Sequence, residues 1–320
     1  MNPTVTIALP VLNEEVHLDR TLDSIEAQTY PRIVEVLVAD GGSGDRTRAI
    51  AAARPGVRVI DNPGVTQAAG LNRILASARG EIIVRVDGHC MLASDYVARC
   101  VEALDRTAAA LVGGPMVPEG DGPMSRSVGH AMSSAVGAGP ARFHVSGDEG
   151  WVDTVYLGAY RAELAREAGG YAEDVGVNED GEFAIRMTPY GGVWFTPAIS
   201  SRYVPRSSIP SLSRQFFRYG RSRAATVRRH PSAVKARQLA APALLVGLLS
   251  PWRRIVAPVY LGVLAFAAIG AFPDRDIAGR LPIVMATMHL SWGAGFFVGV
   301  VAPPRAPART AGFGLGEEAA

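Results

Sequence analysis

The sequence contains few cysteines and lacks the motifs of two common nucleotide-binding classes. Its only cysteines among 320 residues are Cys90 and Cys100. They have neither zinc-site spacing nor the number needed for a disulfide framework, so we expect two reduced, packed thiols. "PVLNEE" (10–15) replaces a G-x-G-x-x-G after the first predicted strand, and "DGGSGDRT" (40–47) lacks the lysine of a phosphate-binding loop. A dinucleotide-binding fold and a P-loop NTPase are therefore disfavoured.

A secretory signal is also absent. The N-terminal "MNPTVTIALPVLNEE" (1–15) shows no basic region followed by a long apolar core and a small-residue cleavage site. We therefore expect the N-terminal domain to stay in the cytoplasm.

Charged residues are missing from two long runs near the C-terminus. "IVAPVYLGVLAFAAIGAF" (255–272) and "LPIVMATMHLSWGAGFFVGVV" (281–301) contain no acidic or basic side chain apart from His289. Each run approaches the roughly 20 residues that a bilayer crossing needs. We predict two membrane spans; the alternative, two buried helices of a soluble core, is weakened because neither run is amphipathic. A third run, 239–251, could be a re-entrant or interfacial helix, or a crossing that begins nearer Val234.

The basic residues around these runs predict an orientation. If only the two longer runs cross, Arg253 and Arg254 lie on the same side as Arg305 and Arg309. Both ends of the segment would then face the cytoplasm. We predict a multi-pass cell-membrane protein with four regions: a cytoplasmic domain (1–205), a basic segment (206–237), membrane segments (238–302) and a cytoplasmic or flexible tail (303–320).

Up to residue 205 the pattern is that of an α/β protein. Predicted strands at 4–10, 34–40, 57–61 and 81–87 alternate with predicted helices at 15–28, 45–53 and 66–78. Nearly continuous aliphatic strands of this kind indicate a parallel sheet covered by helices on both faces. Ligands bind beyond the carboxyl ends of such strands. Those ends are Pro10, Asp40, Asp61 and Asp87, so acidic residues gather where a ligand is expected.

"VDGH" (86–89) is a candidate metal site. In an extended turn, Asp87 and His89 point the same way and can reach one divalent cation. A carboxylate with an imidazole suits Mn²⁺, or Mg²⁺ shared with a diphosphate, better than a closed zinc site. An aspartate that caps a turn beside a surface histidine is the alternative.

Five segments together resemble a known family. "PVLNEE", "VADGGSGDRT" (38–47), "VDGH", "GAYRAELAREAGGY" (158–171) with "NEDGEFAIR" (178–186), and "RQFFRYGR" (214–221) follow the order and spacing of inverting family 2 glycosyltransferases. "VDTVYLGAYR" (152–161), "YVPRSSIPSLSRQFFRYGR" (203–221) and "HLSWGAGFF" (289–297) look most like the succinoglycan-biosynthesis type, membrane glucosyltransferases that act on polyprenyl-linked sugars. The resemblance implies a GT-A nucleotide-diphospho-sugar transferase fold, a mostly parallel sheet with helices on both faces, followed by transmembrane helices.

The resemblance also implies a nucleotide-sugar site. Asp40 would accept the uracil N–H hydrogen bond, and the other residues assigned to the donor are Pro10, Asn13, Glu14, Asn72, Asp87, Gln215 and Tyr219. "LNEE" also reads as a helix start, with acidic residues near the positive end of the helix dipole. Two positions depart from the family: Gly41 stands where a second aspartate is common, and His89 where the metal motif usually ends in aspartate. Mn²⁺ or Mg²⁺ remains the expected ion.

The resemblance assigns the catalytic roles to "NEDGEF" and "RQFFRYG". An acceptor hydroxyl that attacks the anomeric carbon must lose its proton, and Asp180 matches the family's general base. Glu179 would orient the acceptor or a neighbouring group, and Glu182 would start a helix; capping by all three is the alternative. Arg218 would stabilise the leaving diphosphate together with the metal at Asp87 and His89.

Two further segments have alternative interpretations. The wider basic stretch also resembles an interfacial helix attracted to anionic lipid headgroups; its cations are Arg214, Arg221, Arg223, Arg228, Arg229, Lys235 and Arg237. Residues 113–150 are rich in Gly, Pro, Ser and Met and predict a loosely held helix between flexible connections. We expect the insertion 118–150 within them to border the acceptor. Arg142 and His144 there would contact a headgroup or simply be solvated.

The sequence therefore predicts a hexosyltransferase, most simply one that moves glucose from a UDP-sugar to a polyprenyl-diphosphate-linked saccharide. Membrane lipids are expected partners and nucleic acid is not. Tethering the enzyme beside a membrane-bound acceptor raises the effective concentration. A processive polysaccharide synthase would need more spans, and "RQFFRYG" lacks the tryptophan of that form. A catalytically silent nucleotide-sugar-binding membrane protein would need neither "NED" nor Arg218, and a glycoside hydrolase would need no nucleotide pocket.

Overall fold

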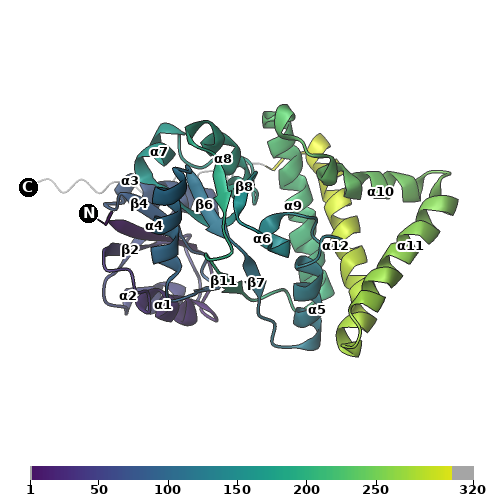
Figure 1. The fold of residues 1–320 in the computed structure, drawn as a ribbon, viewed down its shortest axis with the longest axis horizontal. Helices are drawn as coiled ribbons and strands as arrows, with labels where there is room; N and C mark the ends of the chain where they lie inside the picture. The colour runs from purple at the N-terminus through teal and green to yellow at the C-terminus, as the bar shows by residue number, and fades with distance from the viewer. Residues whose placement is uncertain (1, 305–320) are drawn as a thin grey trace, which may run out of the picture.

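The computed structural model describes residues 2–304 (Figure 1). Within them, one sheet has the strand order β3-β2-β1-β4-β9-β6-β10-β8 and a smaller one has the order β5-β11-β7. The strands of the large sheet are β1 (Val5–Val11), β2 (Ile33–Asp40), β3 (Val57–Asp61), β4 (Ile82–Arg85), β6 (Leu111–Gly114), β8 (Gly150–Val152), β9 (Tyr156–Arg161) and β10 (Val193–Phe195). Those of the small sheet are β5 (Cys90–Leu92), β7 (Met116–Pro118) and β11 (Ser201–Tyr203).

The first four strands form a parallel unit, as the sequence predicts. β1 pairs in parallel with β2 and β4, and β2 pairs in parallel with β3. The register places Asp40 opposite both Val11 and Asp61, so the carboxyl ends of these strands meet at one edge. Asp87 follows the last residue of β4 by two positions and extends that edge.

The second half of the large sheet is mixed rather than parallel. β9 pairs antiparallel with both β4 and β6, and β8 pairs antiparallel with β10. The parallel prediction rested on the regular alternation before residue 90; the long connection that precedes β9 is compatible with either strand direction. From β9 the chain continues through α7 (Ala162–Glu167) to α8 (Glu179–Met187), which begins with the candidate catalytic residues.

Helices cover both faces of the large sheet, which confirms the second part of the prediction. One core lies under α1 (Leu18–Glu26), α2 (Thr47–Ala52) and α4 (Tyr96–Thr107). The other lies under α3 (Gln67–Ser77), α7 and α8. Cys90 and Cys100 are buried and free, as expected for packed thiols.

Two of the C-terminal helices are long and apolar enough to cross a membrane, by length and composition. They are α11 (Arg253–Gly270) and α12 (Arg275–Val301), which contain most of the two predicted spans. On α11, Leu261 is 63% exposed and Phe266 is 74% exposed, so the helix presents apolar side chains outward. α10 (Ala240–Leu249) has ten residues, too few to cross a bilayer as a helix.

Helix α9 (Ile209–Arg229) joins these helices to the sheets. Figure 1 shows α9 and α12 side by side, between the sheets and the pair formed by α10 and α11, and α5 (Pro123–Met132) also packs on α12. Glycines bring the α9 and α12 backbones into contact. A Cβ atom on Gly220 would lie 2.0 Å from the Trp292 carbonyl oxygen, and one on Gly295 would lie 2.0 Å from that of Phe217. The glycine of "RQFFRYG" therefore has a packing function.

Several cations of the predicted interfacial segment have protein partners. Arg221 and Arg228 donate hydrogen bonds of 2.8–3.2 Å to the backbone carbonyls of residues 299–303, which caps the C-terminal end of α12. Arg229 and Arg237 form ion pairs with aspartates. These four arginines therefore cap α12 or form ion pairs, and the attraction of the basic segment to lipid headgroups stays a prediction. Most of the predicted tail lies outside the described residues.

The contact between α9 and α12 can be tested with a matched pair of glycine substitutions. We expect Gly220→Ala to lower the free energy of unfolding by about 1–3 kcal/mol, because the added methyl group overlaps a backbone carbonyl. Gly262→Ala on α11, where nothing lies within 4 Å, should be neutral or gain up to about 1 kcal/mol from helix propensity. Thermal unfolding of the detergent-solubilised protein measures both; equal effects would contradict the close contact.

Candidate active site

Nine of the predicted site residues line a single cleft of about 900 Å³. The cleft starts at the carboxyl ends of β1 and β4 and also contacts α8 to α12. The nine residues are Pro10, Glu14, Asp87, His89, Glu179, Asp180, Gln215, Arg218 and Tyr219. The fold thus gathers segments separated by about 200 residues of sequence into one site.

A buried arginine connects the two acidic segments of this cleft. Arg85 donates two hydrogen bonds of 3.3 Å to Oδ1 of Asp87 and one of 3.1 Å to Oε1 of Glu179. Gln67 donates to the same Asp87 oxygen at 2.6 Å. The side chains of Arg85 and Glu179 are 4% and 3% exposed. Sequence reasoning missed Arg85, although a single charge inside the aliphatic "IIVRV" was a usable signal.

Burial and charge shift the pKa values of this pair. Burial opposes the charged form of Arg85, but the negative charges of Asp87 and Glu179 outweigh it and raise the pKa of Arg85 above its usual range. For Glu179, burial is the largest effect and raises the pKa above that of an ordinary glutamate, although Arg85 acts in the opposite direction and Asp180 in the same. Oε2 of Glu179 and Nη1 of Arg85 are buried without a hydrogen-bond partner among the described residues. Glu179 is therefore anchored by Arg85 and also lines the cleft, and its role in orienting a substrate stays a prediction.

His89 is held by Glu14, the residue predicted for the nucleoside pocket. Nδ1 of His89 lies 2.9 Å from Oε1 of Glu14, and the His89 side chain is 34% exposed. Burial lowers the pKa of His89, but the hydrogen bond to Glu14 and the charges of Glu14 and Asp87 raise it above the usual value. The backbone N–H of Glu14 donates to the Thr47 hydroxyl at 2.7 Å, which fixes the loop after β1.

The residues around "VDGH" supply only part of a metal coordination shell. Across residues 2–304, no group of three or more His, Cys, Asp or Glu side chains is arranged to hold an ion. The hydrogen bonds to Asp87 from the described residues all reach Oδ1, which leaves Oδ2 for a ligand, and Glu14 engages one of the two ring nitrogens of His89. A carboxylate oxygen and an imidazole nitrogen fit Mn²⁺ if other ligands come from a bound diphosphate.

Three predicted donor-site residues lie outside the cleft lining. Asp40 is buried and accepts hydrogen bonds from the backbone and hydroxyl of Ser43 at 3.2 and 2.6 Å. The backbone N–H of Asn13 donates to the same hydroxyl at 2.9 Å. Asn72 exchanges two hydrogen bonds with the Tyr171 backbone, at 2.7 and 2.9 Å. These contacts stabilise loops at the sheet edge, and the nucleotide roles of the three residues remain predictions.

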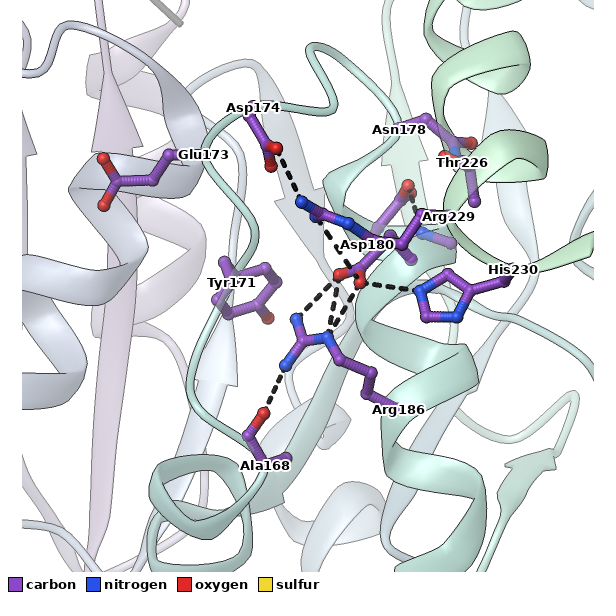
Figure 2. Close-up of polar contacts among 12 residues, drawn as sticks. Ala168, Tyr171, Glu173, Asp174, Asn178, Asp180, Arg186, Thr226, Arg229 and His230 are labelled. Atoms are coloured by element: carbon purple, nitrogen blue, oxygen red, sulfur yellow. Dashed lines mark hydrogen bonds and ion pairs between the residues drawn. The ribbon is translucent and has the colours of Figure 1, made fainter.

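Helix α8 presents Asp180 to the cleft and anchors it through a second buried carboxylate. Oδ1 of Asp180 accepts a hydrogen bond of 2.6 Å from the backbone N–H of Gly181. Glu182, 1% exposed, accepts hydrogen bonds from Arg186 at 2.7–3.0 Å and lies 3.0 Å from Nε2 of His230. Figure 2 shows Arg186, Arg229 and His230 converging on this carboxylate. The sequence predicts that Glu182 starts this helix, and Glu182 lies in the first turn of α8. Through His230, it also links α8 to the end of α9.

Helix α9 contributes polar groups along one side of the cleft. Gln215 donates to the Tyr219 hydroxyl at 2.9 Å. One turn further on, Arg223 lines the cleft, and its Nη2 would lie 3.5 Å from a Cβ on Gly181. Burial lowers the pKa of Arg223, and the charges of nearby aspartates, Asp180 first, only partly offset it. Ser222 and Thr226 hold the backbone of residue 177 and the side chain of residue 178 at 3.1 and 2.7 Å, so α9 also fixes the approach to Asp180.

The insertion between the metal motif and α8 also borders the cleft. Its helix α6 (Arg142–Val145) carries Arg142, which donates to the Asp148 carbonyl at 2.9 Å, and His144, which lines the cleft. Nδ1 of His144 is buried without a partner among the described residues, and burial lowers the pKa of His144 to about 4. His144 is therefore a neutral cleft residue and not a solvated loop residue.

Comparison with known proteins identifies the family. The model of the family "Glycosyl transferase family 2" matches residues 6–169. The chain is 33% identical over 307 residues to the succinoglycan biosynthesis protein ExoA of Rhizobium meliloti, which covers 91% of this chain and 93% of that protein. The chain belongs to glycosyl transferase family 2. It is therefore a glycosyltransferase of glycan biosynthesis, as the sequence predicts.

More distant similarities agree on the fold. A dolichyl N-acetyl-α-D-glucosaminyl phosphate glucuronosyltransferase of Methanococcus voltae is 23% identical over 239 residues, 70% of this chain and 74% of that one. A mannosyltransferase from Pyrobaculum calidifontis, solved with GDP-Man and Mn²⁺, aligns with a TM-score of 0.61 at 21% identity over 94% of this chain and 88% of that one. The family 2 glycosyltransferase thus has the predicted GT-A fold.

The Arg85 ion pairs can be tested by comparing single and double variants. Arg85→Met should lower the free energy of unfolding by about 3–5 kcal/mol, because it leaves two buried carboxylates without their counterion. In a Glu179→Leu background the same substitution should cost less, because one of those carboxylates is gone. Denaturant unfolding of all four proteins gives the coupling energy, and strictly additive effects would contradict the bridge.

Glu182 should make stability depend on pH. Burial raises the pKa of Glu182, but hydrogen bonds from Arg186 and His230 lower it more, so the folded-state pKa lies below the unfolded value near ~4.3. The stabilisation is therefore present above that value and is lost as the pH falls through the folded-state pKa. We expect Glu182→Gln to be less stable than wild type at neutral pH, with a difference that shrinks below about pH 4. Glu167→Gln on the surface of α7 is the control and should show no such trend.

Proposed function

We propose that this glycosyltransferase moves a hexose, most simply glucose from UDP-glucose, to a lipid-linked saccharide with inversion at the anomeric carbon. The observation that supports this most directly is the composition of the cleft. It contains the carboxylate of Asp180 and the Asp87–His89 pair, together with cleft arginines that have no acidic partner among the described residues. Such a site combines a base with positive charge for a diphosphate.

Asp180 is the proposed general base. It is half-buried in the first turn of α8 and lines the cleft, and its neighbours Glu179 and Glu182 both form ion pairs. An acceptor hydroxyl at Asp180 would lose its proton to the carboxylate while its oxygen bonds to the anomeric carbon. The bond from that carbon to the diphosphate oxygen breaks on the opposite face. A single displacement of this kind inverts the anomeric configuration.

Positive charge around the leaving diphosphate is the second requirement. Arg206 and Arg218 line the cleft and form no ion pair within residues 2–304, so either can approach a phosphate. Asp87 and His89 would hold a divalent cation, Mn²⁺ or Mg²⁺, which when bound neutralises charge on the diphosphate. The Mn²⁺ in the Pyrobaculum mannosyltransferase supports a divalent ion. Gln215 and Tyr219, joined by their hydrogen bond, would position the donor next to Arg218.

A lipid-linked acceptor would explain why the cleft continues to the apolar helices. Residues of α10, α11 and α12 line the same cleft as Asp180. The name of the Methanococcus relative states a dolichyl-phosphate-linked substrate, and ExoA is named for succinoglycan biosynthesis. We propose that residues 1–205 form the catalytic domain on the cytoplasmic side of the cell membrane and that 238–302 hold it there. Two candidate spans within the described residues disfavour a processive synthase with its own channel.

The proposal is tested by nucleotide release from UDP-, GDP- and dTDP-sugars. The detergent-solubilised protein is assayed with Mn²⁺ or Mg²⁺ and with lipid-linked saccharides extracted from bacterial membranes. We expect acceptor-dependent release of UDP that EDTA abolishes. Asp180→Asn should keep donor binding but lower transfer by about 10²–10⁴-fold, because it removes the base.

Asp148→Asn, an exposed aspartate outside the cleft, is the matched control and should transfer at the wild-type rate. Unchanged transfer by Asp180→Asn would remove Asp180 from the mechanism. Tight UDP binding without turnover on any acceptor would favour a silent nucleotide-sugar-binding protein, and no UDP binding would overturn the donor assignment.

A further inference from the structure

The cleft has an apolar lobe whose residues the chemistry of transfer does not require. Its side chains come from α10, α11 and α12. We define the lobe by Ala241, Leu244, Tyr260, Val263, Met288 and Trp292. Four of these six side chains, Ala241, Leu244, Val263 and Met288, are aliphatic or thioether groups that offer little polar interaction to a sugar or a nucleotide. The lobe is suited instead to a hydrocarbon chain.

Hydrogen bonds fix one wall of this lobe. His289 of α12 lies 2.9 Å from the Tyr260 hydroxyl through Nδ1, and 2.9 and 3.1 Å from the carbonyl oxygens of Val136 and Gly137 through Nε2. Carbonyl oxygens only accept, so Nε2 carries the proton and the tyrosine donates to Nδ1. One imidazole therefore holds α11, α12 and the 136–137 loop together. The loop lines the cleft, so the lobe is formed before a ligand arrives.

A cation lies beside the proposed base in the same cleft. Arg223 projects from α9 next to Gly181, the residue after Asp180, and forms no ion pair within the described residues. Its neighbour in the cleft, Arg237, is already paired with Asp153. Arg223 is half-buried, and holding a guanidinium partly out of water without a paired counterion is costly. A phosphate is an anion that a guanidinium can bind through two parallel hydrogen bonds.

We propose that the apolar lobe binds the first isoprene units of the acceptor lipid and that Arg223 binds the phosphate to which they are attached. This deepens the proposed function and rests on it for the identity of the acceptor. The same cleft offers a surface for each part of a lipid-linked saccharide: hydrocarbon against α10 to α12, phosphate at Arg223, and sugar hydroxyl at Asp180. The apolar outer face of α11 would let the rest of the chain remain in the bilayer.

The test is photolabelling of the full-length, detergent-solubilised protein with a benzophenone analogue of farnesyl diphosphate. We expect labels on α10 to α12 at lobe residues, competed by undecaprenyl diphosphate. Leu244→Trp should reduce labelling at least about tenfold by filling the lobe, whereas Leu249→Trp, on the same helix but 79% exposed and outside the cleft, should not. Arg223→Gln should weaken labelling by the diphosphate about tenfold but leave labelling by the uncharged benzophenone alcohol unchanged.

The readout does not depend on turnover, so the two proposals can fail separately. Asp180→Asn should be labelled like wild type, because it removes chemistry and not lipid binding. Labelling that is spread over the outer face of α11 would contradict lipid binding in the apolar lobe. Labelling that Leu244→Trp and Leu249→Trp reduce equally would contradict it as well. Lobe labelling together with absence of transfer to any lipid-linked saccharide would instead count against the proposed function.

Discussion

The buried ion pairs of Arg85 are the interaction on which the site depends. One guanidinium, inside an otherwise aliphatic strand, binds Asp87 at the end of β4 and Glu179 at the start of α8. These carboxylates are 92 residues apart in the sequence and would repel each other without the cation between them. Because a buried charge is stable only when it is paired, the requirement to satisfy Arg85 fixes how α8 docks on the sheet. The position of Asp180 follows from that docking.

Helix α9 connects this arrangement to the apolar helices. On one side, Ser222 and Thr226 hold the residues before α8, and the end of α9 contacts Glu182. On the other side, Gly220 allows α12 to approach until backbone touches backbone. An apolar helix and the proposed catalytic carboxylate are thus separated by one rigid element. This geometry suits an enzyme whose acceptor is held by a lipid, because the distance from the apolar helices to the base is set by packing rather than by a flexible linker.

The sequence predicted much of the fold and of the site. The sequence alone predicts the first four strands, the helices on both faces, both apolar helices and the family. Each of these predictions rests on local periodicity or on motifs that occur in a fixed order. The direction of β9 and the small sheet were not predicted, because strand direction depends on long-range pairing. Arg85, His289 and Arg223 were missed as site residues for a similar reason. Arg85 and His289 are important because of hydrogen-bond partners that lie 29 to 153 positions away in the sequence. Arg223 is important because of the cleft that it lines.

By itself, the sequence determined the order of the segments that supply the proposed chemistry. An acidic loop follows each parallel strand, and then come the segment with the proposed base, the segment with Arg218 and the apolar helices. These features follow from side-chain chemistry and spacing, which the chain carries before it folds. Only the tertiary structure decided which of them meet. It brought nine predicted residues into one cleft, and it placed Asn13, Asp40 and Asn72 outside the cleft lining, where they also form loop contacts. It also joined that cleft to an apolar lobe. These contacts between distant segments depend on how the helices pack across the sheet. That packing is set by buried charges and by backbone contacts, which no linear motif encodes.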